Sequence, residues 1–200
     1  MLEIPESAVV ARQARETLLG KTLTAVQVNA SPHKFAFFFG DPTGYPALLI
    51  GATFTGGRAL GGQVELSAGD LRLVFSDGIN LRYFPPQSAV PAKHQLCLGL
   101  SDGSHLVSTV QMYGFLAAFH DGENDNPYYL VAQAKPSPLT DAFDEVYFDA
   151  LWNASPANLS LKAFLATEQR IPGLGNGVLQ DILFVARLNP RRKLAEVTEP

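Results

Sequence analysis

The chain has 200 residues, of which 46% are hydrophobic and 17% charged, with a formal net charge of −4. This composition excludes a disordered chain, and the length suits one large domain or two small ones. The single cysteine, Cys97, excludes an internal disulfide and a four-cysteine zinc site within these residues. No apolar run reaches the roughly 18 residues that a membrane span requires. We expect a soluble, cytoplasmic protein, cytosolic or associated with a bacterial nucleoid.

The first predicted element is a helix over residues 5–19. Val10, Ala14 and Leu18 recur every four residues, which gives the helix one apolar stripe. Gly20 follows as a stop signal.

Residues 22–119 form short apolar or alternating runs separated by turn signals. The pairs Asp77-Gly78 and Asp102-Gly103 each lie between two such runs, which is typical of β-hairpins. Two hairpins of this kind predict an antiparallel sandwich or flattened barrel. The predicted strands cover 23–28, 34–39, 47–54, 71–75, 79–84, 96–100 and 105–110.

The segment 120–138 is polar and rich in glycine, asparagine and proline, which is typical of a linker. Beyond it the pattern is helical, with Ser160 as a plausible N-cap. The predicted helices cover 141–151, 160–168 and 177–187, and a fourth begins near 193, so we expect the helical domain to be incomplete here.

Charge is distributed unevenly along the chain. Residues 121–149 hold seven acidic and one basic side chain, a balance of −6, whereas 162–193 hold six basic and two acidic ones, a balance of +4. The basic segment suggests a phosphate-bearing partner, although ordinary surface variation is an alternative.

The most informative stretch is Gly173-Leu174-Gly175-Asn176, directly before the helix over 177–187. Glycines at a helix start let backbone N–H groups approach an anion closely. Asn176 can cap the helix or donate its amide to a phosphate oxygen.

The string from Arg170 to Pro190 resembles the helix-two-turn-helix motif of the formamidopyrimidine-DNA glycosylase and endonuclease VIII family. Further segments resemble that family's motifs in the same order. They are the start Met1–Glu6, the basic strand His33-Lys34-Phe35, the turn Phe54-Thr55-Gly56, the hairpin from Ser101 to Phe115, and the linker Pro136–Phe143.

The resemblance implies an α+β fold: an N-terminal antiparallel β-sandwich with flanking helices over 1–120, a linker over 121–140, and an all-helical helix-two-turn-helix domain over 141–200. It implies double-stranded, damaged DNA bound in the cleft between the domains by a monomer. The implied activity is base-excision repair by a bifunctional DNA glycosylase and abasic-site lyase for oxidised bases, in which an amine forms a Schiff base with the sugar.

The resemblance also assigns residues. The catalytic set is Met1, Leu2, Glu3 and Lys34, with Glu3 as the proton shuttle and Leu2 standing where the family has its nucleophilic proline. Lys162, Gly173, Gly175 and Asn176 are expected to contact the DNA strand. Phe54, Gln111, Met112 and Tyr113 are expected to fill the gap left by the extruded base, with core packing as the alternative for Phe54 and Tyr113.

Two other functions remain open. Leu2 and Gln111 also fit a member that binds damaged DNA without chemistry, and the acidic segment fits a module that binds a protein partner. We expect no metal or cofactor in these residues; zinc would enter only with a cysteine finger after residue 200.

Overall fold

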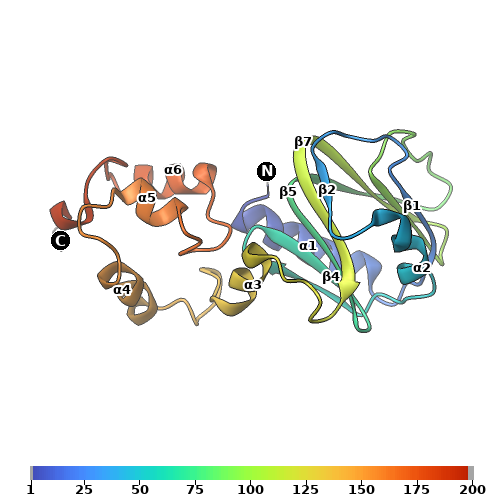
Figure 1. Cartoon of the computed structure of the whole chain (residues 1–200), viewed down its shortest axis with the longest axis horizontal. Coiled ribbons are helices and arrows are strands. Elements are labelled where there is room, and N and C mark those ends of the chain that lie inside the picture. The colour runs from blue at the N-terminus through green and yellow to red at the C-terminus, as the bar shows by residue number, and fades with distance from the viewer. Residues whose placement is uncertain (1, 198–200) are drawn as a thin grey trace.

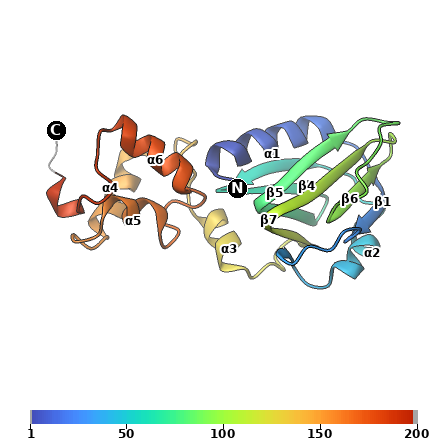
Figure 2. The same cartoon turned by 90° about the horizontal axis from the view of Figure 1, so that it is seen from above.

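The computed structural model describes residues 2–197 and has two parts side by side along its long axis (Figures 1 and 2). The strand-rich part holds two helices, α1 (Ile4–Leu18) and α2 (Tyr45–Leu49), and a short 3₁₀ turn over Pro42–Gly44. The other part is helical, with α4 (Glu145–Asn153), α5 (Leu161–Ala166), α6 (Asn176–Val185) and a 3₁₀ turn over Leu194–Glu196. Helix α3 (Pro127–Ala134) lies where the two parts meet.

Seven strands belong to one hydrogen-bonded sheet, ordered β1-β6-β7-β5-β4-β3. Strand β2 adds to β7 in parallel, and the other pairs are antiparallel. The α+β class is confirmed, but the predicted sandwich is one continuous sheet rather than two. The strands are β1 (Leu23–Val28), β2 (Ala36–Phe38), β3 (Gly56–Leu60), β4 (Gln63–Ala68), β5 (Leu71–Phe84), β6 (Leu96–Leu100) and β7 (His105–His120).

The long strands β5 and β7 explain why the sheet is continuous. They pair from Leu71 opposite His120 to Phe84 opposite His105, with a register shift between Asp77 and Ile79. The predicted hairpin at Asp77-Gly78 is therefore wrong, because the pair forms a bulge inside one strand. The hairpin at Asp102-Gly103 does connect β6 to β7.

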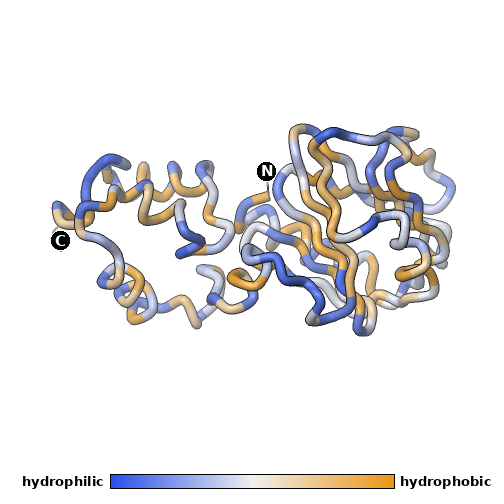
Figure 3. The backbone as a smooth tube through the Cα atoms, in the orientation of Figure 1, coloured by the Kyte–Doolittle hydropathy of each residue, from blue (hydrophilic) through white to orange (hydrophobic). Residues whose placement is uncertain are grey.

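Each part has its own apolar core, as the hydrophobic residues along both parts in Figure 3 indicate. In the first, residues of every long strand pack against Ala11 and Leu18 of α1 and Leu49 of α2. In the second, Phe164 is fully buried beneath the rings of Phe148 and Trp152.

The helical predictions hold in outline, with different ends. The helices begin after capping side chains: Asp144 accepts a hydrogen bond from the Tyr147 amide, and Ser160 accepts one from the Ala163 amide. Helix α3 lies inside the segment predicted as linker, and only a 3₁₀ turn forms near residue 193.

A buried polar network attaches α3 to the sheet. The Tyr129 hydroxyl donates to Glu65 Oε2 at 2.6 Å, and Arg58 Nε contacts Glu65 Oε1 at 2.7 Å. Burial, and then the bond to Glu65, raise the pKa of Tyr129 above its usual range. The charge of Glu65 is thus paired although its side chain is buried.

Within residues 2–197, no helix is long and apolar enough to cross a membrane. Among the same residues, no group of three histidine, cysteine or carboxylate side chains could hold a metal ion.

Phe164→Ala should lower the free energy of unfolding of the helical part by about 3–5 kcal/mol, because it opens a cavity in a filled core. Trp152, the only tryptophan, packs 5.2 Å from the Phe164 ring and reports the transition in denaturant. Val185→Ala, at a side chain 80% exposed, should change stability by less than about 0.5 kcal/mol. Equal effects of the two variants would contradict this description of the core.

Candidate active site

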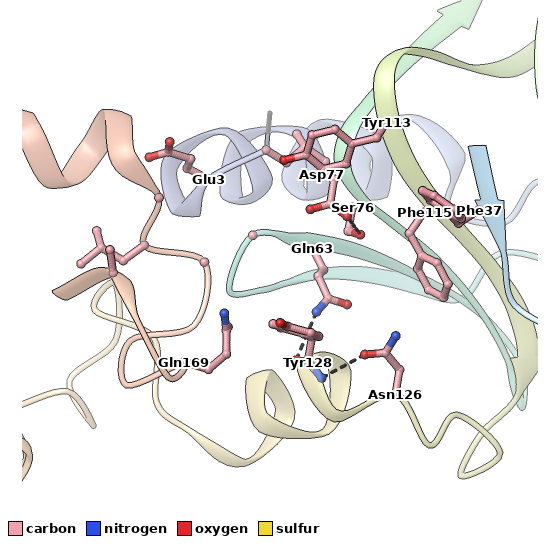
Figure 4. A pocket seen from close by; sticks show the side chains of 16 residues that line it. Glu3, Phe37, Gln63, Ser76, Asp77, Tyr113, Phe115, Asn126, Tyr128 and Gln169 are labelled. Atoms are coloured by element: carbon pink, nitrogen blue, oxygen red, sulfur yellow. Dashed lines mark hydrogen bonds between the residues drawn. The ribbon is translucent and has the colours of Figure 1, made fainter. Parts of the chain in front are cut away.

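A cavity of about 490 Å³ lies between the strand-rich and helical parts (Figure 4). Its wall combines the N-terminal segment, the bulge of β5, the start of α3 and the loop before α6. Four aromatic rings and several amide and carboxylate side chains line it. They are Phe37, Tyr113, Phe115 and Tyr128, with Glu3, Gln63, Ser76, Asp77, Asn126 and Gln169.

Glu3 connects the two parts of the molecule. Its carboxylate accepts hydrogen bonds from the backbone N–H groups of Gly177 at 3.0 Å and Val178 at 2.8 Å, in the first turn of α6. These N–H groups have no partner within the helix, and the helix dipole favours a negative charge there. The side chain is only 8% exposed, so the contact is shielded from water.

Gly175 and Gly173 are required by close packing at this junction. A Cβ on Gly175 would overlap the carboxyl group of Glu3. Gly173 has a φ of +80°, and a Cβ there would overlap the backbone of Gly61 and Gly62 in the turn between β3 and β4. The sequence analysis expected these glycines to admit an anion; the anion that the start of α6 holds is the carboxylate of Glu3.

Backbone contacts fix the segment around Glu3 on both sides. The Leu2 N–H donates to the carbonyl oxygen of Asp77 at 2.6 Å, and the Ile4 N–H donates to that of Gly173 at 3.1 Å. Glu3 is therefore held between β5 and the loop before α6. Met1, predicted to belong to the catalytic set, lies outside the described residues.

Asp77 was missed as a site residue, because its pairing with Gly78 suggested only a turn. It has a φ of +60°, a conformation that few residues other than glycine adopt. Its side chain lines the cavity and accepts a hydrogen bond from the Ser76 hydroxyl at 3.0 Å. A signal was available: apolar alternation continues on both sides of the pair, as in one bulged strand.

The predicted gap-filling residues separate into two groups. Gln111, Met112 and Tyr113 are exposed neighbours on β7, and Tyr113 lines the cavity. Phe54 is 1% exposed and packs in the core of the strand-rich part. The expectation for Phe54 is therefore wrong, since a ring without an accessible face cannot enter a base stack.

Neither predicted lysine lines the cavity. Lys34 is exposed in a turn before β2 rather than in a strand, and its Nζ lies 5.3 Å from the centre of the Phe35 ring. Lys162 is exposed on α5. Asn176 is exposed at the first position of α6, next to Gly175, which does line the cavity. The structure thus gathers Glu3, Gly173 and Gly175 at one opening, with Asn176 beside it.

Glu3→Ala should lower the free energy of unfolding by about 0.5–2 kcal/mol, because two N–H groups of α6 lose their acceptor. Denaturant unfolding followed by Trp152 fluorescence measures the loss. Glu16→Ala, at an exposed position of the same helix, is the control and should change little. A Glu3 variant as stable as the control would show that the contact does not hold the two parts together.

Sequence comparisons show what the chain is similar to. No protein-family model matches it. It is 26% identical over 199 residues to a formamidopyrimidine-DNA glycosylase of Cytobacillus firmus, covering 96% of this chain and 69% of that protein. The proteins of that name from Legionella pneumophila and Lactococcus lactis are 27% and 25% identical, covering 99% and 100% of this chain and 70% and 72% of theirs.

Solved structures show the same fold. A complex of the Lactococcus lactis protein with abasic-site DNA superimposes with a TM-score of 0.80 at 19% identity, over 98% of this chain and 72% of that one. MutM bound to DNA containing carbocyclic 8-oxoguanine gives a TM-score of 0.78 at 20% identity, over 98% and 73%. Together with the motifs and the junction at Glu3, these similarities show that the chain is a member of the formamidopyrimidine-DNA glycosylase and endonuclease VIII family.

Proposed function

We propose that this chain is a DNA repair glycosylase, which binds damaged double-stranded DNA and releases a damaged base. The observation that carries the proposal is the cavity between the two parts, where Glu3 is fixed at the start of α6 beside aromatic, amide and carboxylate side chains. Its volume of about 490 Å³ accommodates one nucleotide turned out of the duplex.

The DNA strand would run past the exposed start of α6. Asn176 can donate its amide to a phosphate oxygen, and Lys162 on α5 adds a positive charge. Exposed basic residues continue at Arg187, Arg191 and Lys193. The overall charge of −4 does not oppose this, since the field near the basic segment is set by its own side chains.

The exposed residues of β7 would occupy the space that the extruded base leaves. Met112 is 73% exposed and Tyr113 borders the cavity, so an apolar side chain and an aromatic one face the same region. Apolar side chains between base steps are an established way to hold a duplex open.

Two finer statements belong to the same proposal. The resemblance implies a preference for oxidised bases and a second activity, cutting the strand at the abasic site through a Schiff base. Lys34 lies just before β2, whose residue Phe37 lines the cavity, which supports its amine as a nucleophile for the second activity.

Affinity for a duplex with a tetrahydrofuran abasic analogue should fall steeply with salt. Lys162→Ala should weaken binding and reduce the slope of log K against log salt by about 1, because one phosphate contact is lost. Asn176→Ala should weaken binding and leave the slope unchanged. Fluorescence anisotropy measures both, with Lys93→Ala, in the loop between β5 and β6, as the matched control. Absent affinity at low salt would refute the proposal.

Borohydride trapping on an abasic duplex tests the cutting activity. A covalent adduct of protein and DNA is expected, and Lys34→Ala should reduce its yield, whereas Lys93→Ala should not. If the full-length protein forms no adduct, strand cutting through an amine does not occur.

A further inference from the structure

Asp77 is placed in the cavity by a local distortion that the fold does not otherwise need. Strands β5 and β7 pair regularly on both sides of it, and the register shifts only between Asp77 and Ile79. Bulges of this kind redirect a side chain and occur often beside active sites.

The backbone at Asp77 is held in an unfavourable conformation. Its φ is +60°, and the next residue must be glycine because a Cβ on Gly78 would come within 2.5 Å of the carbonyl oxygen of Tyr113. A non-glycine residue in the left-handed region stores strain, which persists where the surroundings enforce it and is found at functional sites. The strain here orients one carboxylate.

The two carboxylates that line the cavity have different surroundings. Glu3 accepts two backbone N–H groups with its two oxygens, so its lone pairs are largely committed to α6. Asp77 is half-buried and receives the hydroxyl of Ser76 on Oδ2. Figure 4 shows Asp77 between Ser76 and Tyr113, away from the start of α6. Among the described lining residues, Asp77 is therefore the carboxylate placed to take a proton.

We propose that Asp77 is the general base of a hydrolytic base release, an inference that rests on the proposed glycosylase function. A water molecule loses a proton to the Asp77 carboxylate as its oxygen forms a bond to C1′ of the sugar. The bond from C1′ to the base nitrogen breaks, and its electron pair leaves with the base. The proton on Asp77 is then transferred to the departed base, so water is the only co-reactant and the products are the free base and an abasic sugar.

The aromatic side chains complete this arrangement. Phe37, Phe115 and Tyr128 line the same cavity and offer ring faces to a planar base. A base held against them would leave its C1′ toward the mouth of the cavity, where Asp77 and Leu2 meet. Cutting at a preformed abasic site is a separate step and does not use Asp77 in this scheme.

The test compares wild type with Asp77→Asn in single-turnover assays on a duplex containing one formamidopyrimidine lesion. Asparagine tolerates a positive φ, so the bulge should persist. Base release, measured as free base by chromatography, should fall by about 100-fold or more. Affinity for the tetrahydrofuran duplex and stability in denaturant should stay within twofold and about 0.5 kcal/mol of wild type. Asp125→Asn, at an exposed loop residue, is the matched control and should release base at the wild-type rate.

Two results would overturn the role of Asp77 alone. One is wild-type base release by Asp77→Asn; the other is a borohydride-trapped adduct that accumulates in step with base release, because an amine would then be the nucleophile. Failure of the wild-type protein to release any base would instead refute the proposed function itself.

Discussion

The contact between the Glu3 carboxylate and the first turn of α6 is the interaction on which the rest of the structure depends. It joins residues 174 and 175 positions apart in the chain and crosses from the strand-rich part to the helical part. A helix start exposes unpartnered N–H groups and a partial positive charge, and a carboxylate satisfies both. Because Gly175 has no Cβ, the carboxylate can reach them.

This contact also defines the cavity. With Glu3 fixed, the neighbouring Leu2 and Ile4 bond to β5 and to the loop before α6, so three consecutive residues hold opposite walls at a set separation. Helix α3 provides the remaining wall, and the buried bond between Tyr129 and Glu65 keeps it on the sheet. The cavity is thus enclosed by polar contacts between elements that have separate apolar cores.

The division of work between two carboxylates follows from their surroundings. Glu3, saturated by backbone donors, suits a positioning role at the junction, whereas Asp77 is oriented by a strained bulge and a single hydroxyl. The family resemblance had directed attention to Glu3 and to the residue before it. Such strain is characteristic of functional sites, since only a constraint from the surroundings sustains it.

The sequence by itself determined the elements whose signals are local. Periodic apolar residues predicted the first helix, capping residues such as Ser160 marked later ones, and the string around Gly175 and Asn176 identified the family. Tertiary structure decided what depends on distant partners: whether Asp77-Gly78 turns the chain or bulges a strand, whether Phe54 is exposed, and that Glu3 caps α6. Local propensity contains no information about these, because each is set by a neighbour that folding brings from elsewhere in the chain.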